Sequence, residues 1–174
     1  MVEKRNPLLF IGLVLVAVFA GYFIYDNFIA PKPVGTVGIA EGNLLLDQTI
    51  PSVDGSGSVS FSDYRGKVLV IDFLAPWCDP CKEQVDVLAE IASINGVEVI
   101  SINIDRKYDM QSLQAFADEE GIKWFFGHNP TSAIDFEVAG IPTVLVVDKN
   151  GLIVHRGYFT TIQEFDVILP KLLG

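Results

Sequence analysis

The sequence predicts an α/β domain in which helices flank a central mixed sheet, preceded by a transmembrane helix. From Leu44 onward, apolar runs typical of strands alternate with segments whose apolar residues recur at helical spacing. Residues 8–25 contain no charged side chain and are rich in Leu, Val, Phe and Ile. We therefore divide the 174 residues into a cytoplasmic tip and anchor at 1–25, a tether rich in Pro and Gly at 26–43 and a domain at 44–174.

The apolar run at 8–25 is long enough to cross a bilayer. As a helix it would span about 27 Å, close to the roughly 30 Å hydrocarbon core. Tyr22 and Tyr25 at its far end suit the membrane interface. A cleaved signal peptide is the competing interpretation, with Lys4 and Arg5 as its basic leader. Cleavage after Ala20 would leave only a short apolar core, so we favour a retained anchor.

Charge predicts the orientation of the anchor and limits the choice of partners. Lys4 and Arg5 precede the run, whereas Asp26 is the first charge after it. The positive-inside rule then places the N-terminus in the cytoplasm and the domain outside, as a single-pass protein of the cell membrane. The formal net charge of −10 would repel phosphate backbones, so nucleic acid is not expected as a partner.

The first half of the domain is expected to contain three strands and two helices. A short strand at 59–61 follows a Gly-Ser-Gly turn, and the apolar run at 68–73 is a central strand. The helix at 82–93 has apolar residues at helical spacing, and a second core strand covers 97–104. A further helix at 110–120 stops at a glycine.

The second half is expected to end in a hairpin and a helix. A short strand at 124–126 and a short helix at 132–136 come first. The strands at 143–147 and 152–156 are joined by an Asn-Gly turn, which favours a hairpin. The last helix opens with the capping box that Thr161 and Glu164 form, and Pro170 is expected to disrupt its end.

Both cysteines lie in one short motif, Trp77-Cys78-Asp79-Pro80-Cys81. A strand precedes the motif and a helix follows it. Two thiols separated by two residues at the start of a helix form a reversible dithiol/disulfide switch. The motif therefore predicts a redox centre.

Structural explanations of the two cysteines are weaker. A disulfide that closes so short a loop gives roughly 2 kcal/mol, against about 5 kcal/mol for a loop of about a hundred residues. A structural zinc site needs about four ligands. The only histidines are His128 and His155, which lie far from the motif in the sequence and read as surface or turn residues. We expect no bound metal.

The motif and its surroundings resemble the thioredoxin superfamily. The segment 71–82, together with Gly140-Ile141-Pro142-Thr143, carries this resemblance. The lead-in at 61–68, the extra strand and helix within 97–136 and the segment 147–154 are similar to membrane-anchored oxidoreductases of the TlpA/ResA type. The resemblance implies a thioredoxin-like fold, no cofactor and protein disulfide substrates. We also expect a transmembrane electron donor to keep Cys78 and Cys81 reduced, because the compartment outside the cytoplasm offers no reductant.

The motif assigns different roles to its residues. Cys78 precedes the helix, where free backbone N–H groups and the helix dipole stabilise a thiolate, so we expect it to be the exposed nucleophile. Cys81 lies one turn further and is the resolving thiol. Pro80 fits the first helical turn. Asp79 places a negative charge beside the thiolate, which favours a reductase.

Residues outside the motif complete the expected site. Asp72 lies within an apolar strand, so burial should raise its pKa. Its position matches the buried acid of thioredoxins, which implies a general base that acts on Cys81 through water. A structural carboxyl and a solvent-facing position are the alternatives. Pro142 matches the family's cis-proline, which lets Ile141 offer its backbone to an extended substrate, and Trp77 forms part of the apolar rim.

The sequence departs from the family at three positions. Ser101 occupies the place of a basic residue that accompanies the buried acid in many thioredoxins. Gln84, next to Glu83, replaces a glutamate common in the TlpA/ResA branch, and Asp86 replaces a helix proline. These departures weaken the case for the specialised role in cytochrome maturation that a resemblance to this branch suggests. They leave the dithiol chemistry untouched.

The expected function is a membrane-anchored thiol–disulfide oxidoreductase outside the cytoplasm. We expect it to reduce disulfides of exported proteins, with apocytochrome c as one candidate substrate. A disulfide-forming oxidant or isomerase is the first alternative. A copper carrier on the same fold is the second, and it would need His128 or His155 to join the two thiolates.

Overall fold

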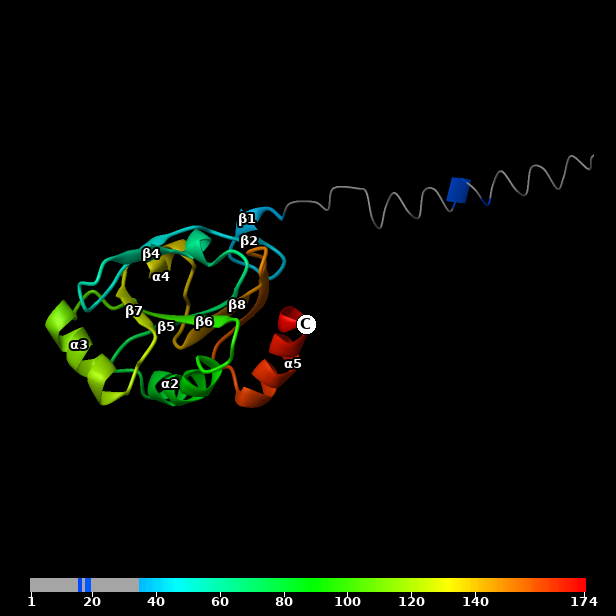
Figure 1. Cartoon of the computed structure of the whole chain (residues 1–174). Coiled ribbons are helices and arrows are strands. Elements are labelled where there is room, and N and C mark those ends of the chain that lie inside the picture. Colours follow the sequence, from blue (N-terminus) through cyan, green and yellow to red (C-terminus); the bar gives the residue numbers. More distant parts are fainter. Residues whose placement is uncertain (1–15, 17, 20–34) are drawn as a thin grey trace, which may run out of the picture. The chain divides into compact units, whose positions relative to one another are not determined.

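The computed structural model describes Val16, Val18, Phe19 and residues 35–174. The chain divides into two units, Met1–Val34 and Gly35–Gly174, and Figure 1 labels most elements of the second. Val16, Val18 and Phe19 are helical and exposed. The remainder of the expected anchor and residues 26–34 of the tether lie outside the described residues. Within the part that is described, no helix is long and apolar enough to cross a membrane.

A mixed sheet of five strands forms the centre of the second unit, in the order β7-β6-β5-β8-β9 (Figure 1). Strand β5 runs parallel to β6, which runs parallel to β7, whereas β8 is antiparallel to both β5 and β9. The sheet confirms the predicted parallel core and terminal hairpin. The strands are β5 Val68–Leu74, β6 Val97–Asn103, β7 Phe125–His128, β8 Thr143–Val147 and β9 Ile153–Gly157.

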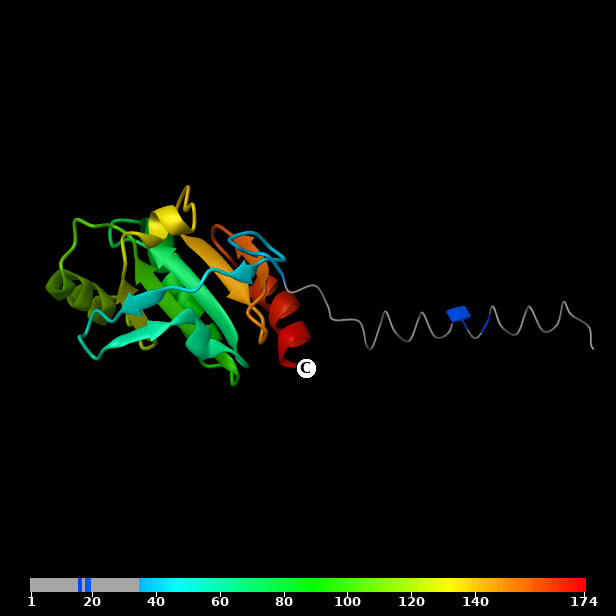
Figure 2. The same cartoon turned by 90° about the horizontal axis from the view of Figure 1, so that it is seen from above.

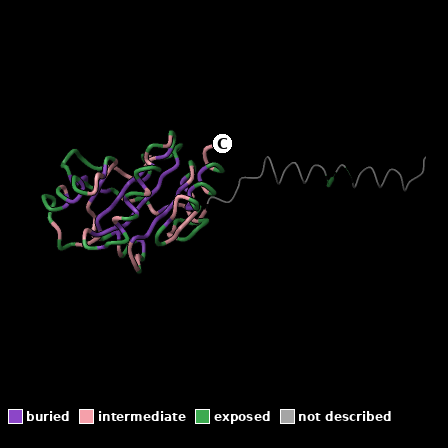
Figure 3. Tube along the Cα trace, turned by 90° about the horizontal axis from the view of Figure 1, so that it is seen from below, coloured by how far each residue is buried: buried purple, intermediate pink, exposed green. Residues whose placement is uncertain are grey.

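Helices and a small sheet cover the two faces of the central sheet. In Figures 1 and 2, α2 and α5 lie on one face with α3 beside α2, and α4 lies on the other face with β3 and β4. The buried residues follow the central strands in Figure 3. The helices are α2 Asp79–Ile91, α3 Met110–Glu119, α4 Ser132–Asp135 and α5 Ile162–Leu173.

The alternation of side chains along β5 positions the site. Leu69 and Ile71 pack into the core on the face covered by α4, whereas Val70 and Leu74 pack against the other face, under α2. Because successive side chains of a strand point to opposite faces, Asp72 lies on the same face as Val70 and Leu74. The strand therefore carries this carboxyl beneath the helix that begins at the cysteine motif.

The described domain begins ahead of the expected boundary at residue 44. The compact unit starts at Gly35, and residues 35–43 of the expected tether belong to it. Here β1 (Val37–Gly38) pairs in parallel with β2 (Leu44–Leu45). The Gly42 N–H also donates to the Ile153 carbonyl at 2.8 Å. These contacts use the backbone, so a segment rich in Pro and Gly and without periodicity can still pack onto the domain.

The small sheet and the last helix differ slightly from the expected elements. Strand β4 (Ser58–Ser60) pairs antiparallel with β3 (Thr49–Pro51), and the 3₁₀-helix η2 (Phe61–Tyr64) follows directly. Helix α5 continues past Pro170 to Leu173, so the expected disruption does not occur. The proline lies in the last turn, and the helix is held by its N-terminal capping box and its buried apolar side chains.

Candidate active site

The two cysteines form a disulfide at the start of α2. Their sulfurs are 2.08 Å apart and their Cα atoms 5.2 Å apart. Cys78 is the N-cap of the helix, Asp79 and Pro80 are exposed in its first turn, and the Cys81 N–H donates to the Cys78 sulfur at 3.2 Å. After reduction, the same N–H and the helix dipole would stabilise a Cys78 thiolate. The structure thus joins the predicted pair of sulfurs at the predicted position.

Both cysteines are buried, which corrects the expectation of an exposed Cys78. The accessible fraction is 4% for Cys78 and 0% for Cys81, so Cys78 remains the more accessible of the two. Both sulfur-bearing side chains belong to an apolar cluster that also includes Leu74 and Val85, with Ile141 packed against it. This packing covers Cys78 more fully than its place at a helix terminus suggested.

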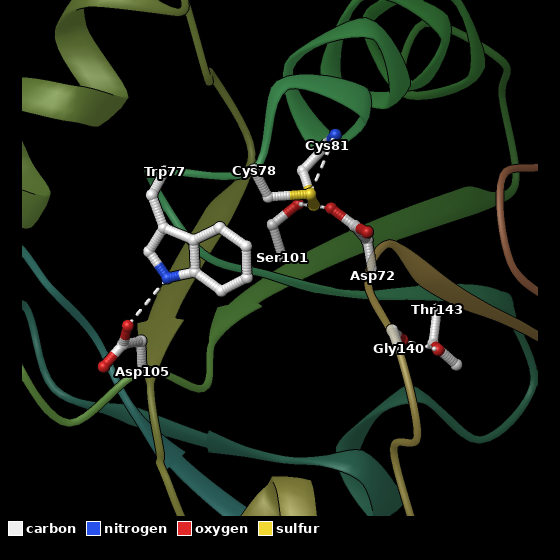
Figure 4. Close-up of a disulfide and its surroundings, with 8 residues drawn as sticks. All are labelled: Asp72, Trp77, Cys78, Cys81, Ser101, Asp105, Gly140 and Thr143. Carbon is white, nitrogen blue, oxygen red and sulfur yellow. Dashed lines mark hydrogen bonds between the residues drawn. A yellow bond between two sulfur atoms is a disulfide. The ribbon is translucent and has the colours of Figure 1, made fainter.

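Asp72 is a fully buried carboxyl next to the disulfide. Its exposed fraction is 0%, and burial raises its pKa to about 7, opposed by a hydrogen bond from Ser101. The predicted rise in pKa is confirmed, and a solvent-facing position is excluded. In Figure 4 the Asp72 and Ser101 side chains both extend toward the sulfurs. A carboxyl with a pKa near neutrality can accept a proton and release it again at physiological pH.

The two carboxylate oxygens of Asp72 have different surroundings. Oδ2 accepts a hydrogen bond from the Ser101 hydroxyl at 3.2 Å, whereas Oδ1 has no hydrogen-bond partner among the described residues. Ser101 Oγ also accepts a hydrogen bond from Trp124 Nε1 at 3.0 Å. In the sequence, Ser101 stands out only as a departure from the family, and no local pattern marks this role of Trp124. Asp72 and Ser101 are register partners in β5 and β6. The signal that could have indicated their contact is that each is a polar residue within an apolar strand.

The loop before β8 contributes the predicted cis-proline. The Ile141–Pro142 peptide bond is cis. Ile141 packs against the cluster that holds the disulfide, and the Thr143 hydroxyl donates to the Gly140 carbonyl at 2.6 Å. Gly140 and Thr143 lie near the disulfide in Figure 4. The loop therefore sits beside the cysteine motif, as predicted.

Trp77 forms one wall of a groove next to the disulfide. Its side chain is 62% exposed, and its Nε1 donates to Asp105 Oδ2 at 2.7 Å (Figure 4). The groove has a volume of about 300 Å³ and is also lined by Ile104, Val138 and Ile141. Trp77 thus lies among apolar side chains of this groove, and Ile141 connects the groove to the cluster that holds Cys78. Asp105, which the sequence did not single out, holds the indole in place.

Gln84, a departure from the family, has a structural partner. It is fully buried, and its side-chain oxygen accepts the Thr160 N–H at 2.7 Å while its amide nitrogen donates to the Thr160 carbonyl at 3.1 Å. The pair links α2 to the segment before α5. A neutral amide suits this place because it offers both a donor and an acceptor.

The two histidines make contacts with other residues. His128 Nδ1 lies 2.8 Å from Asn103 Nδ2, and His155 Nε2 lies 3.1 Å from Thr160 Oγ1. The described residues contain no group of three or more Cys, His, Asp or Glu side chains that could hold a metal ion.

This combination of fold and site defines a class of protein. A cysteine pair at the start of a helix, a buried acid beneath it and a cis-proline beside it, on a mixed sheet flanked by helices, characterise a thioredoxin-like thiol–disulfide oxidoreductase. Comparison with known proteins agrees, since a profile of the family described as Redoxin matches residues 40–168. The chain belongs to the Redoxin family and is an oxidoreductase of the TlpA/ResA type. Such an enzyme acts on proteins that contain disulfides.

Named relatives share most of their length with the chain. It is 30% identical over 156 residues to thiol-disulfide oxidoreductase ResA of Geobacillus kaustophilus, which covers 86% of this chain and 86% of the relative. It is 25% identical over 160 residues to ResA of Bacillus subtilis, which covers 88% of this chain and 86% of the relative.

Solved structures share the fold. A DsbF homologue from Corynebacterium diphtheriae has a TM-score of 0.65 and 25% identity, covering 83% of this chain and 99% of that one. The thioredoxin domain of a thiol-disulfide oxidoreductase from Bacteroides vulgatus has a TM-score of 0.67 and 20% identity, covering 78% and 99% respectively.

Proposed function

We propose that this protein is anchored in the membrane and reduces disulfides of exported proteins outside the cytoplasm. The observation that carries the proposal is the Cys78–Cys81 disulfide at the start of α2, with the buried Asp72 carboxyl beneath it. The uncharged run at 8–25, with basic residues before it and an acidic residue after it, supports the membrane location. The ResA relatives support the chemistry.

Reduction of a substrate proceeds in two exchange steps. The Cys78 thiolate attacks one sulfur of the substrate disulfide, that bond breaks, and the other substrate sulfur leaves as a thiolate that takes up a proton. Cys81 then gives its proton to Asp72 and attacks the Cys78 sulfur. The mixed disulfide breaks, and the second substrate sulfur leaves as a thiolate that takes up the proton held by Asp72. Two electrons pass from the protein to the substrate, which leaves the protein with its Cys78–Cys81 disulfide.

The groove beside the disulfide gives the substrate its place. Trp77 and Ile141 both belong to its apolar lining, and Ile141 also packs against the cluster that holds the cysteines. An extended peptide lying there can pair with the Ile141 backbone and bring its sulfur to Cys78. Orienting the two sulfurs in this way lowers the entropic cost of the exchange. A membrane protein that carries a reduced dithiol would then restore the pair to the thiol form.

The direction of electron flow distinguishes a reductase from an oxidant. Asp79 supports the reductase, because its charge beside the Cys78 thiolate disfavours the reduced, ionised form and so lowers the reduction potential. We expect the potential of the full chain, equilibrated with glutathione redox buffers, to lie well below that of the glutathione couple. A reduction potential well above that of the glutathione couple, typical of a strong oxidant, would contradict the proposal that the protein is a reductase. Asp79→Asn should raise the potential, while Asp166→Asn, on the exposed face of α5, serves as a charge-matched control.

The membrane location has its own test. The full chain should remain in the membrane fraction after washing with high salt and alkaline carbonate. Protease added outside spheroplasts should remove the domain at 35–174. A chain that is released by carbonate, or whose domain survives the protease while a known external domain is digested, would contradict the proposed location.

A further inference from the structure

A chain of hydrogen bonds buried in the sheet leads from Trp124 to the Asp72 carboxyl. Trp124, directly before β7, donates its Nε1 proton to Ser101 Oγ in β6 at 3.0 Å. The Ser101 hydroxyl in turn donates to Asp72 Oδ2 in β5 at 3.2 Å. Ser101 and Asp72 are both 0% exposed, and Trp124 is partly buried between two apolar clusters. The Ser101–Asp72 bond is therefore shielded from bulk water, and the Trp124–Ser101 bond is partly shielded.

The chemistry of the three groups fixes the direction in which the protons point. An indole N–H can only donate, so Ser101 Oγ must accept the bond from Trp124. The hydroxyl has a single proton, and that proton is then left for Asp72 Oδ2. Without the indole, the hydroxyl could rotate and accept a proton from the carboxyl instead. Trp124 thus determines which way Ser101 faces.

This polarity assigns different tasks to the two oxygens of Asp72. Oδ2 is occupied as an acceptor, which favours the ionised carboxylate. If a proton settled on Oδ2, the Ser101 proton would lose its acceptor in a buried place, which is costly. Oδ1 has no hydrogen-bond partner among the described residues and is free to take up a proton.

We propose that Ser101 and Trp124 are positioning residues that hold Asp72 ready to accept the Cys81 proton at Oδ1. The proposal deepens the proposed function, on which it rests for the identity of the proton donor. The other neighbours of Asp72 exert no competing charge. Its register partner in β8 is the apolar Val144, the cysteine pair lies beside it in Figure 4, and burial and the Ser101 hydrogen bond are the two causes that set its pKa.

The test is a titration of the Asp72 carboxyl in the oxidised full chain. The protein is labelled with ¹³C at aspartate carboxyls, held in detergent micelles and followed by NMR from pH 4 to pH 10, and the Asp72 signal is assigned by its loss in Asp72→Asn. Trp124→Phe removes the indole N–H but keeps an aromatic ring. Ser101→Ala removes the hydroxyl. Ser132→Ala is the matched control, because Ser132 is equally buried and hydrogen-bonded to Gln48, away from the site.

The proposal predicts a distinct order of titration. In Ser101→Ala the acid dissociation constant of Asp72 should fall about tenfold, because the carboxylate loses its hydrogen bond. In Trp124→Phe the acid dissociation constant of Asp72 should also fall, by a smaller factor. In Ser132→Ala it should stay at the wild-type value.

Two results would overturn the assignment. One is a Trp124→Phe protein in which Asp72 titrates as in the wild type, and this variant decides alone if Ser101→Ala does not fold. The other is an equal change in Ser101→Ala and Ser132→Ala. Since the oxidised protein is titrated without substrate, neither result depends on whether the protein reduces or oxidises its partners.

Discussion

Gln84 and Thr160 bind each other through two hydrogen bonds, 2.7 and 3.1 Å long, that bridge α2 and the segment before α5. Both residues are fully buried. The side-chain amide satisfies both the N–H and the carbonyl of Thr160, so the helix that carries the cysteines is tied to the C-terminal part of the domain.

This pairing predicts an effect of pH in Gln84→Glu. A carboxylate cannot donate to the Thr160 carbonyl and would be buried as a charge, so its pKa should rise and the variant should be less stable than the wild type at pH 8. Below that raised pKa, the protonated glutamate can donate again, and stability should recover toward the wild-type value. Urea unfolding of the oxidised proteins at pH 5 and pH 8 measures both effects.

A neutral truncation gives the comparison. Gln84→Ala should lose about 2 to 4 kcal/mol of unfolding free energy at either pH, because it leaves the Thr160 groups unpaired and opens a cavity. Equal stability of Gln84→Glu and wild type at pH 8 would show that the buried pair does not hold the helix.

Asp72 predicts a second dependence of stability on pH. Its pKa is raised to about 7 in the folded protein by burial. A carboxyl whose pKa is higher in the folded than in the unfolded protein stabilises the fold while it is protonated. This contribution is complete at pH values below the pKa of the unfolded chain, and it is lost as the pH rises through the pKa of the folded protein. Asp72→Asn cannot ionise, so it should gain about 2 to 3 kcal/mol relative to the wild type between pH 5 and pH 8. Urea unfolding of the two oxidised proteins checks this, and a constant difference would contradict the raised pKa.

The bond between Trp77 and Asp105 predicts a change in substrate binding. Asp105→Ala removes the acceptor of the indole N–H, 2.7 Å away in the structure, and frees an exposed side chain that forms one wall of the groove. We expect kcat/KM for a disulfide peptide to fall several-fold, mainly through KM, while the unfolding free energy changes by less than about 1 kcal/mol.

A charge-matched control separates positioning from electrostatics in this experiment. Asp166→Ala removes one exposed negative charge from α5, away from the groove. If Asp166→Ala lowers kcat/KM as much as Asp105→Ala does, the effect arises from net charge, and Trp77 does not need its hydrogen bond to Asp105.

The sequence was sufficient wherever the signal is local. The run of apolar residues in β5, the helix after the cysteines and the hairpin of β8 and β9 have patterns that a few neighbouring residues set. Asp72 could be singled out because a carboxyl in an apolar strand is costly to bury. The cysteine pair carries its chemistry in its spacing alone.

Contacts between distant segments escaped prediction. The bonds from Trp124 to Ser101 and from Trp77 to Asp105 depend on the pairing of strands and on loop positions that only the folded chain defines. The burial of Cys78 likewise follows from side chains of several elements, including Leu74 and Ile141. Propensity and spacing describe single elements, whereas these features arise where elements meet.

The central claim is that Cys78 attacks protein disulfides and Cys81 resolves the product. The most direct measurement expresses the full chain as Cys81→Ser and as Cys78→Ser, then compares non-reducing gels of membrane extracts after acid quenching. Cys81→Ser should accumulate mixed disulfides with exported proteins that disappear on reduction, and Cys78→Ser should accumulate few. A folded Cys81→Ser protein that captures no partner, or a Cys78→Ser protein that captures the same partners, would contradict this division of roles.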